Sequence, residues 1–293
     1  MKKILFKGCG TAIATPFDEN GVNLVEFEKL LESQIQNKVD AIIVCGTTGE
    51  ASTMTTEEKI ATIKCAVKVS NKRVPIIAGT GGNNTRQVIE FSKTVESLGV
   101  DGLLIVTPYY NKCTQEGLIT HYKEIAKNVS LPIILYNVPS RTGVNISPET
   151  CVELSKIENI VAIKEASGNL SQVAEIAHLC GNNLSIYSGN DDQVLPVLSL
   201  GGIGVISVLS NILPEYTHSM IHNFLNGSVK EATKMQLEAL PLIKCLFSEV
   251  NPIPVKSALN ILGYNYGIPR LPLTPMSKDK EELLKKEIKK FDL

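Results

Sequence analysis

The chain has 293 residues, of which 43% are hydrophobic and 20% charged, and its formal net charge is −1. This composition is typical of a globular protein with a substantial core. No long basic run occurs, so neither nucleic acid nor an anionic membrane is favoured as a partner. The length would allow two average domains, but α/β barrels often use this much chain as one domain with extensions.

The N-terminal segment and the cysteines indicate a reduced protein that is not exported. The opening MKKILFKGCG resembles the start of a secretion signal, but its apolar run, Ile4 to Phe6, is too short for one. No segment approaches the roughly 18 apolar residues of a membrane span. The seven cysteines are scattered and form no CxxC pair. We therefore expect mostly buried thiols and a cytoplasmic location.

Short apolar runs rich in β-branched residues recur along the chain. They lie at 9–17, 41–46, 75–81, 102–110, 132–139, 160–167, 184–191 and 203–211. Near-continuous apolar strands indicate burial on both faces and hence a parallel sheet. The segments between them have helical periodicity, as Leu24, Phe27 and Leu31 illustrate. Eight alternating units predict an α/β protein built as a (β/α)8 (TIM) barrel.

After residue 211 the pattern becomes helical only. One of these helices meets Pro241, where it should kink or break, and another is expected to end at Gly263. Ser277 is expected to cap the last helix. We therefore predict a catalytic barrel over residues 1–213 and a C-terminal helical extension over residues 214–293.

Functional residues of a barrel gather where its strands end and the βα loops begin. Read in chain order, these positions hold Thr47 and Thr48, then Tyr110, then Tyr136 and Arg141, then Lys164, with Gly189 and Ile206 in the last two units. The set contains an amine, phenols, hydroxyls and a guanidinium, which together could carry out covalent and proton-transfer chemistry.

Lys164 ends the apolar strand IVAIK. Strand alternation places it on the same face as Ile160 and Ala162, which would turn it into the barrel. Burial there favours the uncharged amine, which can attack a ketone and form a Schiff base. The alternative is a strand-end lysine that reaches water, which is commoner for a single lysine. The tyrosines and the arginine at neighbouring strand ends favour the catalytic interpretation.

The neighbouring residues each have a functional and a structural interpretation. Tyr136 shares a face with Ile134, so its phenol could reach the same pocket and transfer protons. Arg141 could clamp a carboxylate, and the GTTG turn at Thr47 and Thr48 could seat another. The alternatives are a rim tyrosine that caps a loop, a surface ion pair and an ordinary βα turn.

Signals for metals and cofactors are weak. His218 and His222 lie at i and i+4, a spacing that can bind a metal ion, but no carboxylate of the HExxH type accompanies them. We interpret them as surface or packing histidines and expect no metal site. The chain has no GxxxxGK[ST], GxGxxG or Gly-x-Ser-x-Gly motif, so nucleotide binding and serine-hydrolase chemistry have no support.

Several segments together resemble the dihydrodipicolinate synthase / N-acetylneuraminate lyase family. They are GTTGE, TPYYNKCTQEG, YNVPSRTG, IKEASG and GND…GGIGVISV. Matching motifs extend from GTAIATPF to IPRLPLTP, so the resemblance covers almost the whole chain. Thr47, Thr48, the paired tyrosines and Arg141 are similar to the dihydrodipicolinate synthase branch.

The resemblance implies a condensation of pyruvate with L-aspartate 4-semialdehyde in lysine and diaminopimelate biosynthesis. Lys164 would form a Schiff base with pyruvate, and loss of a methyl proton would give an enamine that attacks the aldehyde. The substrate's own amine would then displace the lysine and close the ring. The lysine supplies the electron sink, so neither a metal nor an organic cofactor is implied.

The resemblance also implies a proton relay and an assembly. Tyr136, Thr48 and Tyr110 would form the relay. Tyr110 would enter from a neighbouring subunit, which implies a tight dimer within a homotetramer.

Substrate-binding roles are implied in the same way. Arg141 would bind the carboxylate of the semialdehyde, whereas Thr47 and Thr48 would seat that of pyruvate. Gly189 and Ile206 would line the pocket of the lysine.

One departure concerns feedback inhibition by L-lysine. Inhibited members bind lysine at a subunit interface, and Asn83 and Tyr109 of that site remain here. Where those members carry two histidines and a glutamate, this chain has Thr56, Lys59 and Gln87. Lys59 would repel a cationic effector, and the lost glutamate removes an attraction. We predict weak or no inhibition by L-lysine.

Two alternative functions stay open. One is another Schiff-base aldolase that splits a sugar acid such as N-acetylneuraminate or 2-keto-3-deoxygluconate. Arg141 and Tyr110 argue against it, because a polyol would need hydroxyl and amide partners. The other is a catalytically silent barrel with a binding or regulatory role, against which the intact Lys164, Tyr136 and Thr48 argue.

Overall fold

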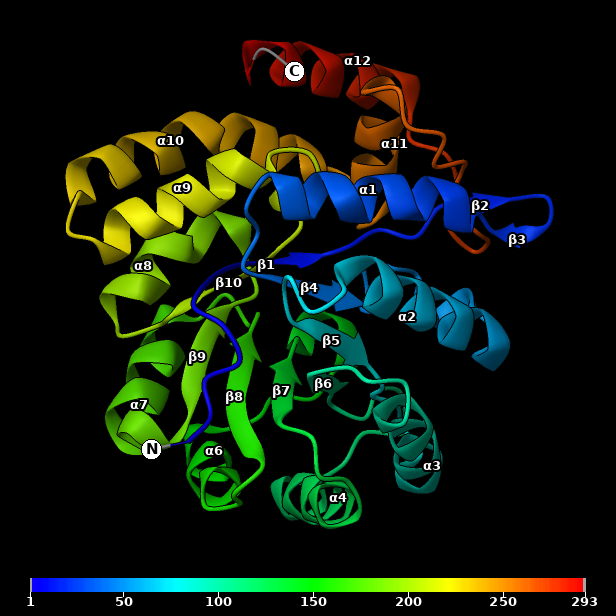
Figure 1. Ribbon diagram of the computed structural model, residues 1–293. Helices are drawn as coiled ribbons and strands as arrows, with labels where there is room; N and C mark the ends of the chain where they lie inside the picture. Colours follow the sequence, from blue (N-terminus) through cyan, green and yellow to red (C-terminus); the bar gives the residue numbers. More distant parts are fainter. Residues whose placement is uncertain (1, 292–293) are drawn as a thin grey trace.

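The computed structural model describes residues 2–291, which form a closed barrel of eight parallel strands (Figure 1). Around the barrel the order is β1, β10, β9, β8, β7, β6, β5 and β4, and β4 pairs with β1 to close it. The strands are β1 Gly8–Ala12, β4 Ala41–Val44, β5 Ile76–Gly79, β6 Gly102–Val106, β7 Ile133–Asn137, β8 Ile160–Glu165, β9 Ser185–Ser188 and β10 Gly204–Ser207. The predicted (β/α)8 barrel is confirmed.

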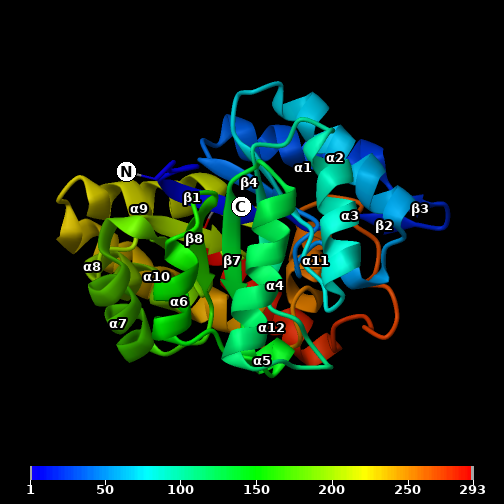
Figure 2. The same cartoon turned by 90° about the horizontal axis from the view of Figure 1, so that it is seen from below.

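Helices separate consecutive strands and surround the barrel (Figures 1 and 2). They are α1 Leu24–Gln36, α2 Thr56–Ser70, α3 Thr85–Glu96, α4 Gln115–Asn128, α6 Pro148–Ser155, α7 Leu170–Cys180, α8 Val194–Ser199 and α9 Pro214–Leu225, with a short α5 Pro139–Thr142. The run predicted at 9–17 is too long for one strand. Its end instead enters a small antiparallel hairpin of β2 Phe17–Asp18 and β3 Gly21–Val22.

The barrel strands are buried on both faces, which explains their apolar sequences. One hydrophobic cluster fills the barrel and includes Ile43, Leu104, Ile134 and Ile206. A second, larger cluster lies between the sheet and the helices. The position of a residue in the strand alternation therefore decides whether its side chain faces the interior or the helical layer.

A β-bulge interrupts this alternation in β8. The register between β7 and β8 shifts by one residue near the start of both strands. Ile160 consequently packs in the outer cluster, whereas Val161 and Ala162 both pack in the inner one. The prediction that Ile160 shares a face with Lys164 was wrong, although Ala162 does share it.

The C-terminal helices are α10 Val229–Leu246, α11 Ile253–Ile261 and α12 Lys278–Ile288. Helix α10 continues through Pro241, so the break that the proline suggested does not occur. Helix α11 ends just before Gly263, close to the predicted position. Ser277 precedes α12, but its Oγ donates to Glu249 Oε1 at 2.7 Å instead of capping the helix.

The helical layer of the barrel runs on into the C-terminal part. Helix α9 follows β10 and packs against β1, so the alternation of strands and helices continues beyond residue 213. Helix α10 lies alongside α9, and α12 packs on both α10 and α11 (Figure 1). The division into 1–213 and 214–293 stays a prediction. None of the helices within residues 2–291 has the length and apolar character needed to cross a membrane.

Candidate active site

Lys164 lies inside the barrel at the carboxyl end of β8. The register places it level with Tyr136 on β7 and with Tyr187 on β9. Lys164 is only 6% exposed. Its Nζ lies 4.5 Å from the centroid of the Tyr136 ring. The lysine is therefore sheltered within the barrel instead of extending into bulk water.

Glu165, the next residue in the chain, has different surroundings. Its Oε2 accepts hydrogen bonds from Asn137 Nδ2 at 2.9 Å and from Gln172 Nε2 at 3.2 Å. Its Oε1 accepts from the backbone N–H of Ser167 at 2.7 Å. Amide groups thus hold this carboxylate on the side of the sheet opposite to Lys164.

Asp191 is a buried acid near the lysine that sequence reasoning did not single out. Its Oδ2 accepts from the backbone N–H groups of Val208 at 2.9 Å and Leu209 at 3.0 Å, just after β10. Burial raises the pKa of Asp191, and the charge of Lys164 acts in the opposite direction. The signal available in the sequence was an acid in the loop after a barrel strand.

The GTTG turn after β4 is held by the C-terminal helices. Thr48 is buried, and its Oγ1 accepts a hydrogen bond from Asn251 Nδ2 at 3.0 Å. A hydroxyl that accepts this bond still has its own proton to donate. Asn251 lies between α10 and α11, 203 residues from Thr48, so no local pattern in the sequence indicates this contact.

A buried ion pair fixes the residue that follows this turn. Glu50 has a positive φ of 53°. Its Oε1 accepts from Lys256 Nζ at 2.8 Å, and its Oε2 accepts from the backbone N–H of Arg270 at 2.9 Å. The C-terminal part of the chain therefore positions the turn that carries Thr47 and Thr48.

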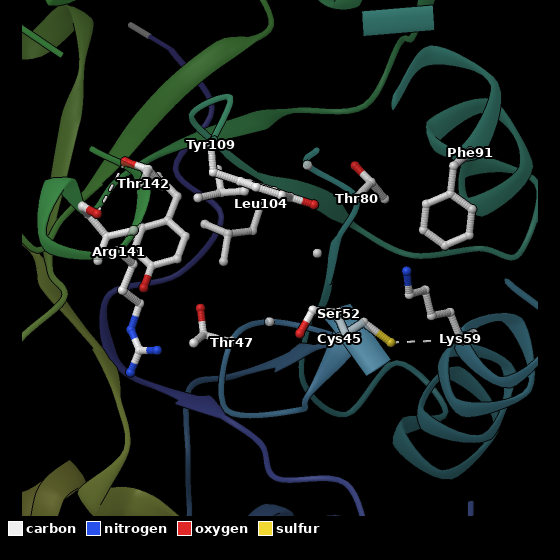
Figure 3. A pocket seen from close by; sticks show the side chains of 17 residues that line it. Cys45, Thr47, Ser52, Lys59, Thr80, Phe91, Leu104, Tyr109, Arg141 and Thr142 are labelled. Atoms are coloured by element: carbon white, nitrogen blue, oxygen red, sulfur yellow. Dashed lines mark hydrogen bonds between the residues drawn. The ribbon is translucent and has the colours of Figure 1, made fainter. Parts of the chain in front are cut away.

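A cavity of about 340 Å³ lies at this end of the barrel (Figure 3). Three of the predicted site residues, Thr47, Tyr136 and Arg141, line it. Figure 3 shows Arg141 and Thr47 toward one side of the cavity and Lys59 and Phe91 toward the other. Hydroxyl groups such as that of Thr47, together with the cationic side chains of Lys59 on α2 and Arg141 on α5, therefore surround the cavity.

The other predicted residues do not line this cavity: Lys164, Thr48, Tyr110, Gly189 and Ile206. Lys164 adjoins it through Tyr136, which touches both. Ile206 belongs to the inner cluster of the barrel. The backbone N–H of Gly189 donates to Glu165 O at 2.7 Å, so it lies directly beside the end of β8.

Two predicted residues lie near the rim. Arg141, on α5, is exposed, and its Nη2 donates to Asn251 O at 3.3 Å. Tyr110 is 91% exposed and has a φ of 71°, a conformation that is uncommon for a tyrosine. One chain by itself therefore does not bring Tyr110 to the lysine.

Closed parallel barrels that hold an amine at the carboxyl ends of their strands, away from water, are suited to lyases that work through a Schiff base. That is the class of enzyme that this fold and this lysine define.

Comparison with known proteins specifies the class further. The chain belongs to the dihydrodipicolinate synthetase family, which it matches over residues 5–291. It is 58% identical over 285 residues to a 4-hydroxy-tetrahydrodipicolinate synthase of Caldicellulosiruptor saccharolyticus, covering 97% of this chain and 96% of that one. The resemblance seen in the motifs is confirmed.

Solved structures agree with this assignment. A monomeric dihydrodipicolinate synthase variant is 41% identical, with a TM-score of 0.97 and coverage of 99% of this chain and 98% of that one. A DHDPS from Cyanidioschyzon merolae, solved with lysine bound, is 40% identical, with a TM-score of 0.95 and coverage of 98% of both chains.

Proposed function

We propose that this chain is a 4-hydroxy-tetrahydrodipicolinate synthase, which condenses pyruvate with L-aspartate 4-semialdehyde in diaminopimelate and lysine biosynthesis. The family match and the 58% identity to a relative of that name support the proposal. The observation that carries it is the position of Lys164, which is sheltered inside the barrel with its Nζ 4.5 Å from the Tyr136 ring centroid.

Lys164 acts as the nucleophile. Its uncharged Nζ attacks the keto carbon of pyruvate, and loss of water gives an iminium ion. When a methyl proton leaves, the electrons of that C–H bond move toward the iminium and form an enamine. The enamine carbon attacks the aldehyde carbon of the semialdehyde, whose oxygen takes up a proton. As this C–C bond forms, the nitrogen lone pair restores the iminium. The substrate amine then attacks the iminium carbon, closes the ring and releases Lys164 as an amine.

These steps need groups that can both donate and accept protons. Tyr136 is well placed, because it lies against Lys164 and also lines the cavity. Thr48 complements it, since its Oγ1 already accepts the Asn251 N–H and retains a proton to donate. We assign Tyr136, Thr48 and Tyr110 to the proton relay.

Both substrates carry a carboxylate that the site has to recognise. We assign the semialdehyde carboxylate to Arg141, whose planar guanidinium suits bidentate binding. Pyruvate's carboxylate is assigned to the turn of Thr47 and Thr48, of which Thr47 lines the cavity. We assign Gly189 and Ile206 to the surroundings of Lys164, beside the cavity and not in its lining.

A second copy of the chain would complete the site with Tyr110. Two hydrogen bonds connect its loop to Asn83: Asn83 Nδ2 donates to Tyr109 O, and Asn111 Nδ2 donates to Asn83 O, both at 3.0 Å. The loop nevertheless leaves Tyr110 91% exposed. We propose that Tyr110 enters a partner's site in a tight dimer, and that two dimers form a tetramer. Sedimentation analysis tests the assembly, and a monomer with full activity would contradict it.

Mixing two inactive variants tests the role of Tyr110 directly. Coexpressed Lys164→Ala and Tyr110→Phe chains can form hybrid dimers. If Tyr110 crosses the interface, the Tyr110→Phe chain keeps Lys164 and receives an intact Tyr110 from its partner, so activity returns. If Tyr110 serves its own chain, the hybrids stay as inactive as the Tyr110→Phe enzyme.

Borohydride trapping with pyruvate tests the central step. The expected result is a reduced adduct on the peptide that contains Lys164, and no adduct in Lys164→Ala. Absence of an adduct in the wild type would favour the silent barrel. Assays with L-aspartate 4-semialdehyde and with N-acetylneuraminate then identify the substrate. An adduct without turnover of the semialdehyde would contradict the proposed substrate alone.

The cysteines bear on where the enzyme works. All seven are free thiols, and Cys113 is the one that is only partly buried. Free, buried thiols are typical of proteins from reducing compartments. We propose a cytoplasmic location on this basis.

A further inference from the structure

A second polar cluster lies at the end of the barrel opposite to Lys164. Asp40 immediately precedes β4, at the amino end of that strand, and His218 and His222 lie one turn apart on α9. His218 Nδ1 lies 3.1 Å from Asp40 Oδ2, and His222 Nε2 lies 3.1 Å from both carboxylate oxygens. The interpretation of these histidines as surface or packing residues overlooked Asp40, which is 178 residues from His218 in sequence.

The three side chains present the donor atoms of a metal site. Their ligand-type atoms all lie within 4.8 Å of one another. Tetrahedral Zn²⁺ with bonds of about 2.0–2.1 Å places its ligand atoms about 3.3 Å apart. The three separations of 3.1 Å between imidazole nitrogens and carboxylate oxygens are close to this value. Imidazole and carboxylate ligands suit Zn²⁺ and related divalent transition metals, and a fourth position is left for water.

The surrounding backbone holds the carboxylate and leaves room beside it. Asp40 Oδ2 also accepts the backbone N–H of Cys9 at 2.7 Å, an interaction of the kind that orients metal ligands. A Cβ atom on Gly8 would lie 2.1 Å from Asp40 Oδ2 and 2.7 Å from His222 Nε2. Gly8, with a φ of +112°, therefore allows the three groups to converge against bare backbone.

The cluster is accessible to an ion without being fully solvated. The side chains of His218, His222 and Asp40 are 20%, 33% and 20% exposed. Lys38, which lies two residues before Asp40 in the chain, is paired with Glu215 at 3.3 Å. Its charge is therefore partly compensated, and the Asp40 carboxylate can favour a cation.

We propose that Asp40, His218 and His222 bind one divalent transition-metal ion of the Zn²⁺ type. The ion would tie α9 to the amino ends of β1 and β4, far from Lys164, and would stabilise the barrel without taking part in turnover. Binding requires Nδ1 of His218 and Nε2 of His222 to be unprotonated, so each neutral ring would carry its proton on the other nitrogen.

Titration of the metal-stripped full-length enzyme with Co²⁺ and Zn²⁺ tests the site. Calorimetry should show one ion bound per chain. Bound Co²⁺ should give the visible absorption bands of a four-coordinate site with nitrogen and oxygen ligands, and the melting temperature should rise. His218→Ala and His222→Gln should each weaken binding at least about tenfold. His178→Ala is the matched control, because His178 is an exposed helical histidine elsewhere on the surface, and it should bind like the wild type.

Turnover of the two histidine variants in metal-free buffer shows that they are folded, since neither residue belongs to the catalytic site. The proposal is overturned if the wild type binds no ion, if His222→Gln binds as tightly as His178→Ala, or if Co²⁺ shows thiolate charge-transfer bands. In each of those cases the three residues form only a hydrogen-bonded contact between α9 and the barrel.

Discussion

Two buried lysines of this chain lie in different surroundings. Lys164 ends β8 inside the barrel, whereas Lys256 lies on α11 and is 0% exposed. The Nζ of each lysine lies over an aromatic ring, 4.5 Å from the centroid of Tyr136 for Lys164 and 4.3 Å from that of Phe17 for Lys256. Lys256 also has a carboxylate partner, Glu50, at 2.8 Å. Among residues 2–291, Lys164 has no such ion pair.

The difference teaches that burial alone does not give a lysine a chemical role. Burial lowers the pKa of Lys256, but the Glu50 carboxylate opposes this and keeps a specific partner for the ammonium. A buried ion pair of this kind fixes the position of the segments that it joins, in this case the turn that contains Thr47 and Thr48. Lys164 lies over the Tyr136 ring instead and has no ion-pair partner among residues 2–291, so its amine is available to react with a substrate.

Lys164→Ala should have the largest effect. Removal of the nucleophile should lower kcat about 10⁴-fold or more, and no pyruvate adduct should be trapped. The melting temperature should stay close to that of the wild type, because no ion pair is broken. Coupled turnover assays, trapping and thermal melts measure the three quantities. An adduct that persists on another lysine would contradict the assignment.

Tyr136→Phe makes the surroundings of Lys164 resemble those of Lys256, with a phenyl ring beneath the Nζ atom. Loss of the phenol should lower kcat about 10²- to 10⁴-fold, while pyruvate can still be trapped. Tyr187→Phe is the matched control, because Tyr187 is level with Lys164 on the other side but donates its hydroxyl to Phe6 O at 2.7 Å. The control should lose about 0.5–1.5 kcal/mol of stability and little activity. Equal activities of the two variants would exclude Tyr136 from the relay.

Lys256→Met tests the other half of the comparison. It leaves Glu50 buried without its partner, so the free energy of unfolding should fall by about 3–5 kcal/mol in urea titrations. Pyruvate should still be trapped on Lys164 at temperatures where the variant is folded. The double variant Lys256→Met, Glu50→Gln should regain part of the stability, since no unpaired charge remains. Loss of trapping at saturating pyruvate in a folded Lys256→Met enzyme would mean that the two lysines do not have separate roles.

The sequence predicted those features that depend on local periodicity. Apolar runs and helical spacing predicted the barrel, because every strand and helix must bury its apolar residues whatever its position in the fold. The interior position of Lys164 followed from alternation with Ala162. The same alternation gave the wrong face for Ile160. A β-bulge, which leaves no periodic signal in the sequence, shifts the register between β7 and β8 at that point.

The sequence could not supply the partners of buried polar groups. Thr48 and Asn251 are 203 residues apart, and Glu50 and Lys256 are 206 residues apart. Such contacts depend on how distant elements meet in the fold, not on any spacing along the chain. The contact of Asp40 with the two histidines of α9 is equally distant in sequence. The spacing of the histidines is compatible with metal binding, but the sequence does not show which carboxylate lies beside them.

A third lysine over a ring gives the smallest expected effect. Lys59 lies half-buried with its Nζ 5.8 Å from the centroid of the Phe91 ring. It lines a hollow that also involves Asn83, Gln87 and Tyr109. Glu90 lines the same hollow, but it is paired with Arg86 at 2.9 Å.

L-lysine carries an ammonium that Lys59 would repel, and Gln87 offers no charge to attract it. Millimolar L-lysine should therefore change the rate of the wild-type enzyme by less than about twofold in steady-state assays. A loss of half the activity under those conditions would contradict the prediction. Lys59→Ala and Gln87→Glu then separate the two causes. Inhibition gained by Lys59→Ala alone identifies repulsion as the barrier, whereas inhibition gained only by Gln87→Glu identifies the missing attraction.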